Sequence, residues 1–303
     1  MPFFPGSMTA AAEFHYRLPA SFGGYRPGAH KGTSLGAGQG FAAHKRLFDH
    51  PDPRRLDLRA SVRDVRREWL VRIQRQRVAV PVNAVVDVSA SMHFGAARSK
   101  LEVAADFVEA LGSSAFRAGD ACGLLAFDHA EREDIFMPAR HSRGAGFVMG
   151  QLLRDCTADD DAASNPQKAG NRGGIDGLRQ SVARLAGRKG LVFLVSDFHW
   201  PLAGLDAVLE LLAPACVVPM VAWDPAETEP PDAQALVAVS DAETGVRRSL
   251  WMRESLRGEW RAGVAARRDE LRTLFEGRGL EPFYLHGAFD GEGLTRHFLE
   301  AVA

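Results

Sequence analysis

The chain has 303 residues, 46% hydrophobic and 25% charged, which is ordinary for a globular protein and excludes a mainly disordered chain. Its 37 Lys and Arg against 38 Asp and Glu give a formal net charge of −1, so no overall basic field predicts nucleic-acid binding. The three cysteines are far apart and fit neither a disulfide framework nor a CxxC metal site, which favours a reducing compartment.

Membrane insertion and secretion are not predicted. No apolar run approaches the roughly 20 residues that a membrane-spanning helix needs. The first residues lack the basic region of a signal peptide, and Pro2, Pro5 and Gly6 interrupt their apolar run. We therefore expect a cytoplasmic protein without a transmembrane segment.

Residues 1–80 are predicted to form an N-terminal arm, an Arg-rich segment and an extended strand that pack on the main domain. Residues 1–45 are rich in Gly and Pro without a helical or strand period, which indicates a loop or arm. Ser61 followed by Asp64 resembles the N-cap of a short helix. Residues 69–82 alternate apolar and polar side chains, which predicts a strand.

From residue 81 onward, strands alternate with helices. Predicted strands cover 82–91, 120–127, 131–137 at an edge, 191–197, 216–223 and 281–285. Predicted helices cover 101–115, 147–153, 177–186, 202–212, 256–275 and 294–302, with core positions for Trp251 and Trp260. This order predicts an α/β fold over 81–303, with a doubly wound, mostly parallel sheet and a β-hairpin inserted near 234–251.

Two strands of this sheet end in oxygen-bearing side chains. Asp87, Ser89 and Ser91 alternate where the first strand ends, and Asp197 ends another. Ligands of such sheets bind at the carboxyl ends of the strands, and Mg²⁺ prefers oxygen ligands. The pattern predicts a magnesium site open to a carboxylate from a partner. The alternative is that these side chains only cap the turns that follow the strands.

The motif Asp87-x-Ser89-x-Ser91, followed by a helix and by a strand ending in Asp197, resembles a von Willebrand factor A domain and its metal-ion-dependent adhesion site, or MIDAS. The order of PDPRRLDLRASVR, VDVSASMHFG, GDACGLLAFD and LVSDF resembles the DUF58 family, whose von Willebrand A-like proteins are associated with MoxR AAA+ ATPases. The chain's size resembles the MxaS members found with methanol dehydrogenase maturation factors.

The resemblance implies that Ser89 and Ser91 bind the cation directly, and that Asp87 and Asp197 bind it directly or through water. Mg²⁺, Mn²⁺ or Ca²⁺ would fit such ligands.

The family pattern also has a threonine in a Gly-Gly-Thr context. Here the matching residues are Gly173-Gly174-Ile175-Asp176, and Ile175 cannot bind a cation. Asp176 or Thr157 would have to replace the threonine, and otherwise the site is degenerate.

By this resemblance the protein is a non-enzymatic adaptor or co-chaperone for a MoxR-type AAA+ ATPase in maturation or metallation of a client, for example methanol dehydrogenase and its calcium. A competing hypothesis is a metal-dependent hydrolase using Asp87 and Asp197, although the sequence shows no positioned general base. A third is a scaffold whose site has lost its metal, which Ile175 favours.

A local basic tract leaves two readings open. Its members are Arg59, Arg63, Arg66, Arg67, Arg72, Arg75 and Arg77. They form either a solvated face paired with Asp64 and Glu68, or a docking surface for an acidic partner. Nucleic acid is less favoured, because only Trp69 offers an aromatic platform within the tract.

Overall fold

A computed structural model describes residues 13–18, 23, 26–36, 40–157, 174–231, 236–242 and 245–300. Its main body is built on a six-stranded sheet of order β11-β8-β7-β4-β5-β6. These strands are β4 (Pro81–Asp87), β5 (Ala121–Phe127), β6 (Met137–Arg140), β7 (Leu191–Ser196), β8 (Cys216–Trp223) and β11 (Phe283–His286). All neighbours pair in parallel except β5 and β6. The predicted mostly parallel α/β fold is confirmed.

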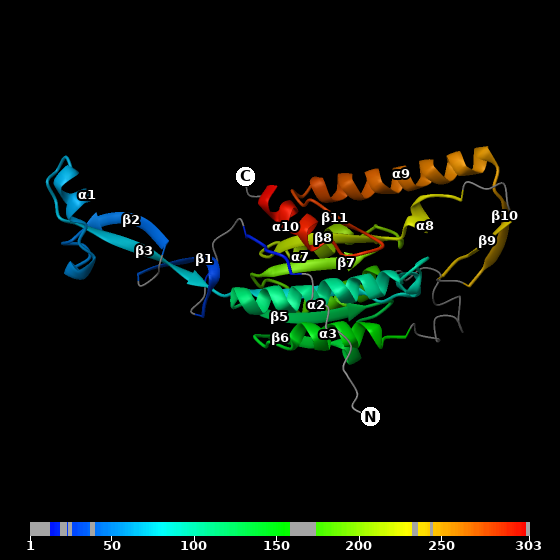
Figure 1. The fold of residues 1–303 in the computed structure, drawn as a ribbon, viewed down its shortest axis with the longest axis horizontal. Coiled ribbons are helices and arrows are strands. Elements are labelled where there is room, and N and C mark those ends of the chain that lie inside the picture. Colours follow the sequence, from blue (N-terminus) through cyan, green and yellow to red (C-terminus); the bar gives the residue numbers. More distant parts are fainter. Residues whose placement is uncertain are drawn as a thin grey trace, which may run out of the picture.

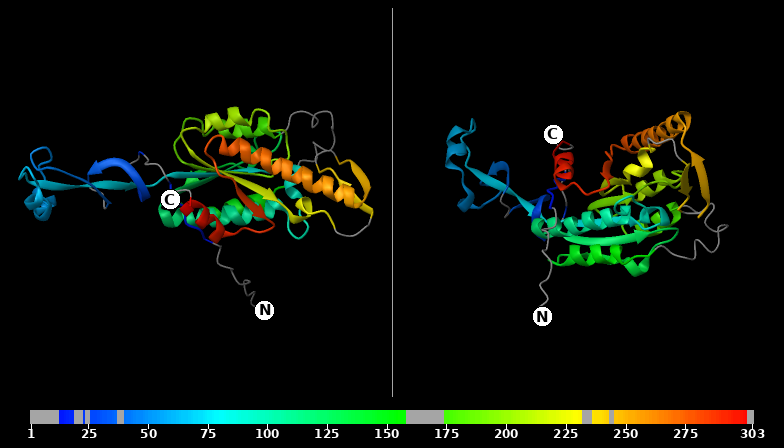
Figure 2. Two further views of the ribbon diagram at one scale, coloured as in Figure 1. Left: turned by 90° about the horizontal axis from the view of Figure 1, so that it is seen from above. Right: turned by 45° about the vertical axis from the view of Figure 1, so that its right-hand side comes forward.

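Helices cover both faces of this sheet (Figures 1 and 2). One layer contains α2 (Lys100–Ala118), α3 (Ala145–Arg154) and α10 (Gly291–Glu300), and the other contains α6 (Ile175–Ala183), α7 (Leu205–Leu211) and α9 (Glu254–Glu276). Strand residues alternate between the two apolar clusters: Ala84 and Val86 join the first, whereas Val85 joins the second. This period of two explains why the central strands are apolar on both faces.

The start of α2 is fixed by a capping box that the sequence encodes locally. Ser99 Oγ accepts a hydrogen bond from Glu102 N at 3.1 Å, and Ser99 N donates to Glu102 Oε2 at 2.9 Å. Gly119 ends the helix in the left-handed conformation, with φ 81°. The capping box sets the first residue of α2, Lys100, beside the carboxyl ends of the strands.

An arm projects from the opposite end of the sheet (Figure 1). It contains a three-stranded antiparallel sheet of order β1-β3-β2, formed by β1 (Pro27–Gly36), β2 (Gly40–Arg46) and β3 (Leu70–Val78). The strand expected over 69–82 is therefore present as β3 and β4. The loop expected for 1–45 is wrong for β1 and β2, because pairing with both edges of β3 makes strands of segments that have no strand period of their own.

The helix of the arm begins earlier than predicted. Helix α1 (Leu58–Arg63) follows a short 3₁₀ helix, η1 (Pro53–Arg55). The N-cap of α1 is Asp57, whose Oδ1 accepts a hydrogen bond from Ala60 N at 3.0 Å. The expected N-cap, Ser61, lies inside the helix and is buried, and Asp64 is the C-cap. Asp57 takes the cap because its carboxylate also binds His44 and Arg72 of the flanking strands, which the local motif does not reveal.

The base of the arm is fastened to the main sheet at Asp120. Its Oδ2 lies 2.5 Å from Tyr16 Oη and 2.6 Å from His30 Nε2, and its Oδ1 accepts from Val80 N at 2.8 Å. Burial, together with the negative charge of Asp120, raises the pKa of Tyr16 above its usual range. Residues 13–18, β1 and the residue that precedes β4 thus meet at the buried carboxylate of Asp120. The division of the chain at residue 80 stays a prediction.

The predicted hairpin is present as β9 (Leu236–Ser240) and β10 (Arg247–Trp251), although residues 243 and 244 of its turn lie outside the described residues. Trp260 is half-buried and donates from Nε1 to Glu227 O at 2.7 Å. The core position predicted for Trp251 is wrong, since its side chain is 54% exposed. A two-stranded ribbon leaves part of its surface uncovered, and Trp251 lies there.

A smaller difference concerns the edge of the sheet. The bounds expected for the edge strand, 131–137, are wrong, because a 3₁₀ helix, η3 (Glu133–Ile135), occupies most of that span and the edge strand β6 begins only at Met137. In the described ranges, no helix combines the length and apolarity needed to cross a bilayer.

Candidate metal centre

Asp87, Ser89 and Ser91 lie together at the end of β4. Asp87 is the last residue of the strand, and its side chain is buried. Ser89 N donates to Asp87 Oδ1 at 3.0 Å, and the Ser89 and Ser91 hydroxyls are 3.3 Å apart. Ser89 occupies the N-cap position of the 3₁₀ helix η2 (Ala90–His93) without a capping bond from its side chain, and this turn makes the two hydroxyls neighbours. Both serines are half-buried, so the oxygen cluster reaches the surface.

Asp197 directly follows β7 and joins the same cluster. Its carboxylate accepts a hydrogen bond from the Ser91 hydroxyl. Parallel pairing of β4 with β7, with Val86 opposite Val195, brings the two strand ends level with each other. The structure therefore brings together all four residues expected at this edge of the sheet.

Asp87 is held by two neutral donors, Ser196 and Trp200, that the sequence analysis did not predict as its partners. Its Oδ2 accepts from Ser196 Oγ at 2.6 Å and from Trp200 Nε1 at 3.1 Å. Burial and the nearby negative charge of Asp197 raise the pKa of Asp87 to about 6. The sequence signal for this contact was the position of Ser196 directly before Asp197. A side chain at the end of one parallel strand can face the end of the neighbouring strand.

Lys100 brings a positive charge into the site from the start of α2. Its Nζ lies 2.7 Å from Asp197 Oδ2 and 2.6 Å from Glu227 Oε1, and the side chain is buried. Burial lowers the pKa of Lys100, but the negative charges of Asp197 and Glu227 outweigh this effect, so the pKa of Lys100 is raised above its usual value. Burial would likewise raise the pKa of Asp197, but Lys100 holds it below its usual range.

Lys100 and Glu227 were not predicted, although each had a sequence signal. Lys100 is spaced four residues from Ala104 and eight from Val108, so it falls on the apolar, buried side of its helix. Glu227 completes a capping box with Asp224 at the start of α8 (Pro225–Thr228). Neither signal by itself indicates a charged group beside the four predicted ligands.

The donor set fits a hard divalent cation. Two hydroxyls and two carboxylates offer only oxygen ligands, which suit Mg²⁺, Mn²⁺ or Ca²⁺. Asp87 is buried, and the donors that its carboxylate meets among the described residues are neutral, as expected where a positive charge belongs. Asp197, His199 and Glu227 form a second possible ligand group, with donor atoms within 4.8 Å of one another, but Lys100 already bridges its two carboxylates.

The threonine of the family pattern has no evident replacement. Ile175 begins α6 and packs against the apolar cluster of that face. Asp176 pairs with Arg179 at 3.9 Å, and Thr157 is exposed. Neither forms a hydrogen bond to the four predicted ligands within the described ranges. Gly173 lies outside those ranges.

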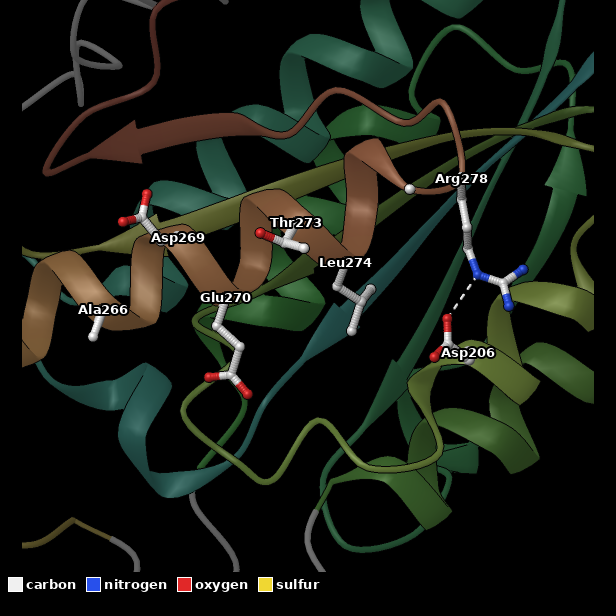
Figure 3. Close-up of a pocket in the computed structure, with 8 residues that line it drawn as sticks. Asp206, Ala266, Asp269, Glu270, Thr273, Leu274 and Arg278 are labelled. Carbon is white, nitrogen blue, oxygen red and sulfur yellow. Dashed lines mark hydrogen bonds and ion pairs between the residues drawn. The ribbon is translucent and has the colours of Figure 1, made fainter.

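A separate hollow lies along α9 and faces α7 (Figure 3). It is lined by Asp206, Asp269, Glu270 and Arg278, among others, and contains none of the four predicted ligands. Arg278 Nε lies 2.8 Å from Asp206 Oδ1 across it. The charged groups that line the hollow are exposed, so the hollow offers no buried set of ligands comparable to Asp87, Ser89, Ser91 and Asp197.

Comparison with known proteins identifies the family. The sequence pattern of the family described as "Protein of unknown function DUF58" matches residues 49–270. The chain belongs to the DUF58 family. Uncharacterized proteins of Mycobacterium tuberculosis and Mycobacterium bovis are 30% identical to it over 227 residues, which cover 70% of this chain and 67% of theirs. The family assignment made from the sequence motifs is confirmed, whereas the MoxR and MxaS associations stay predictions.

Solved structures give weaker likenesses. An aerotolerance-related membrane protein from Bacteroides fragilis is 15% identical, with a TM-score of 0.42 over 74% of this chain and 98% of that one. Proximal thread matrix protein 1 from the mussel byssus, solved with a zinc-occupied MIDAS motif, is 14% identical, with a TM-score of 0.32 over 48% of this chain and 38% of that one.

Proposed function

We propose that this DUF58 chain is a non-enzymatic interaction module that binds a divalent cation through Asp87, Ser89, Ser91 and Asp197. The carrying observation is the meeting of two buried carboxylates with two adjacent hydroxyls at the strand-end edge. Because both serines are half-buried, a cation held there would be reachable from outside. An acidic side chain of a partner protein would then complete its ligands.

The proposed partner is a MoxR-type AAA+ ATPase, and the proposed role is that of adaptor or co-chaperone in the maturation or metallation of a client protein. This step rests on the resemblance within the DUF58 family. Methanol dehydrogenase is the client that the MxaS resemblance suggests. We propose Mg²⁺ as the cation, with Mn²⁺ and Ca²⁺ as the alternatives that the same oxygen ligands would accept.

The arrangement around Asp197 favours binding over hydrolysis. A hydrolase would need a base free to activate a metal-bound water. The ammonium of Lys100 instead bridges Asp197 and Glu227, which leaves these carboxylates compensated rather than poised to accept a proton. An interaction module needs only the cation and an open face.

Calorimetry with Mg²⁺, Mn²⁺ and Ca²⁺ tests cation binding. We expect saturable binding by the wild type and loss of at least tenfold in affinity in Ser89→Ala/Ser91→Ala. Ser113→Ala is the matched control, because the Ser113 hydroxyl donates to Glu109 O on α2. Absence of binding by the wild type at millimolar concentrations would refute the cation site.

Pull-down of a purified MoxR-type ATPase from the same genome, with Mg²⁺ or with EDTA, tests the adaptor role. We expect capture that EDTA and the double serine variant both abolish. Capture unaffected by either would leave a scaffold without metal dependence. Turnover of a phosphoester or peptide panel that the double variant abolishes would establish the hydrolase instead.

A further inference from the structure

The arm as a whole is basic, whereas its far end, residues 48–69, holds six Arg against five Asp and Glu. Residues 40–78 contain eleven Lys and Arg against five Asp and Glu, within a chain whose formal net charge is −1. Arg46, Arg55 and Arg72 pair with acidic neighbours in the arm. Arg59 and Arg63 on α1 are exposed, and neither has an ion-pair partner among the described residues. The guanidinium groups of Arg59 and Arg63 are thus available to an external anion.

Large apolar side chains are exposed beside these arginines. On α1, Leu58 is 60% exposed and Val62 is 83% exposed, and they lie on one side of the helix, four residues apart. Just beyond the helix, Val65 is 97% exposed, and Phe48 and Trp69 of the flanking segments are 95% and 57% exposed. Monomeric proteins seldom gather apolar side chains at the surface in this way without a binding role.

Helix α1 has its polarity reversed relative to an ordinary surface helix. The side chain it buries is Ser61, whose Oγ donates to Asp57 O at 2.7 Å and accepts from Leu70 N at 2.9 Å. The apolar pair Leu58 and Val62 faces outward instead. Folding of the arm therefore does not account for these apolar residues, and an external apolar phase does.

We propose that the tip of the arm, formed by Phe48, α1, Val65 and Trp69, docks on the surface of a membrane rich in anionic phospholipid. The apolar side chains would enter the boundary between headgroups and acyl chains, with Trp69 at the interface. The guanidinium groups of Arg59 and Arg63 match phosphate oxygens and carry the complementary charge. A projecting end suits a deformable, flat surface better than it suits a preformed groove (Figures 1 and 2).

The topology gives this docking a consequence for the rest of the molecule. The arm joins β4 at its amino end, Pro81, whereas the oxygen cluster lies at the carboxyl end, Asp87. The strand is about 20 Å long at roughly 3.3 Å per residue. A docked arm therefore holds the strand-end cluster on the side of the molecule away from the bilayer. The docking does not depend on the proposed cation site.

Flotation with vesicles of equal phosphatidylcholine and phosphatidylglycerol, compared with phosphatidylcholine alone at 0.1 M salt, tests the proposal with the full chain. We expect at least tenfold tighter binding to the anionic vesicles. Val62→Ser/Val65→Ser should weaken it at least tenfold, and Arg59→Gln/Arg63→Gln about 25-fold, at roughly fivefold per arginine. Circular dichroism should show that both variants fold, since all four side chains are exposed.

Matched controls lie on the hairpin and on α10. Leu236→Ser/Leu299→Ser removes two apolar residues that are 64% and 56% exposed, and Arg247→Gln/Arg248→Gln removes two exposed charges. Both controls should bind within twofold of the wild type. Equal binding to the two vesicle types, or tip variants that bind as the wild type does, would overturn the proposal. So would a dimer in solution that Val62→Ser/Val65→Ser dissociates, since the tip would then be an interface between two copies.

Discussion

The ammonium of Lys100 lies 2.7 Å from Asp197 Oδ2, so a positive charge of the chain itself already neutralises one carboxylate of the candidate metal centre. A second contact to Glu227, at 2.6 Å, holds the ammonium between two acidic groups. A cation at Asp87, Ser89 and Ser91 must therefore bind beside a fixed positive charge. If the proposed site holds a cation, we expect Lys100 to lower its affinity.

Lys100→Met should raise the affinity for Mg²⁺ about tenfold, because the repulsion of one nearby charge is removed while the side chain keeps its length. In EDTA the same variant should lose about 3 kcal/mol of unfolding free energy, because two carboxylates lose their partner. Calorimetry and urea unfolding measure the two effects. Lys189→Met, at an exposed position, should change neither. An unchanged affinity in Lys100→Met would show that no cation binds near the ammonium.

Trp200→Phe should lower the unfolding free energy by about 1–2 kcal/mol, because it removes the indole N–H that donates to the buried Asp87 carboxylate at 3.1 Å. Urea unfolding measures the loss. Trp251→Phe alters an indole that is 54% exposed and should leave stability within about 0.5 kcal/mol of the wild type. Equal effects of the two substitutions would mean that the bond to Asp87 carries no net stabilisation.

Asp120→Asn should release the base of the arm, because one buried carboxylate serves Tyr16, His30 and Val80. We expect a loss of about 2–4 kcal/mol from the broken buried network. Hydrogen exchange should quicken in residues 13–18 and in β1 more than in β7 or β8. Asp206→Asn changes an exposed carboxylate and is the control. Uniform quickening over all strands would show global destabilisation rather than release of the arm.

Cys122 should resist thiol reagents in the native protein at pH 8. Burial raises the pKa of its thiol to about 12, so the reactive thiolate is scarce and also inaccessible. Cys156 is half-buried and should react faster. Mass spectrometry after brief alkylation distinguishes the sites, and all three cysteines should react in guanidinium. Rapid native labelling of Cys122 would contradict the packing of β5.

Much of the fold and part of the site follow from local sequence. Apolar runs of strand length alternating with helical periods predicted the mostly parallel sheet, because each strand must bury both faces under helices. The same logic predicted that Asp87, Ser89, Ser91 and Asp197 would meet, since parallel strands end at one edge. These inferences needed only periodicity and the position of polar residues at strand ends.

Other features depend on partners that are distant in the chain. Strands β1 and β2 exist because β3 offers them two open edges, and no local period announces them. The charge of Lys100 enters the site because α2 packs with its first turn against the ends of β7 and β8 and their following residues. The outward face of α1 was likewise decided by a contact between segments, because the hydrogen bond from Leu70 N to Ser61 Oγ fixes which side of the helix faces β3. The sequence by itself determined which segments form the main sheet and which oxygen-bearing side chains gather at its edge. Tertiary packing decided which charges surround those side chains and which apolar residues the arm exposes. The physical reason is that these charges and this exposure arise from contacts between distant segments rather than within one segment.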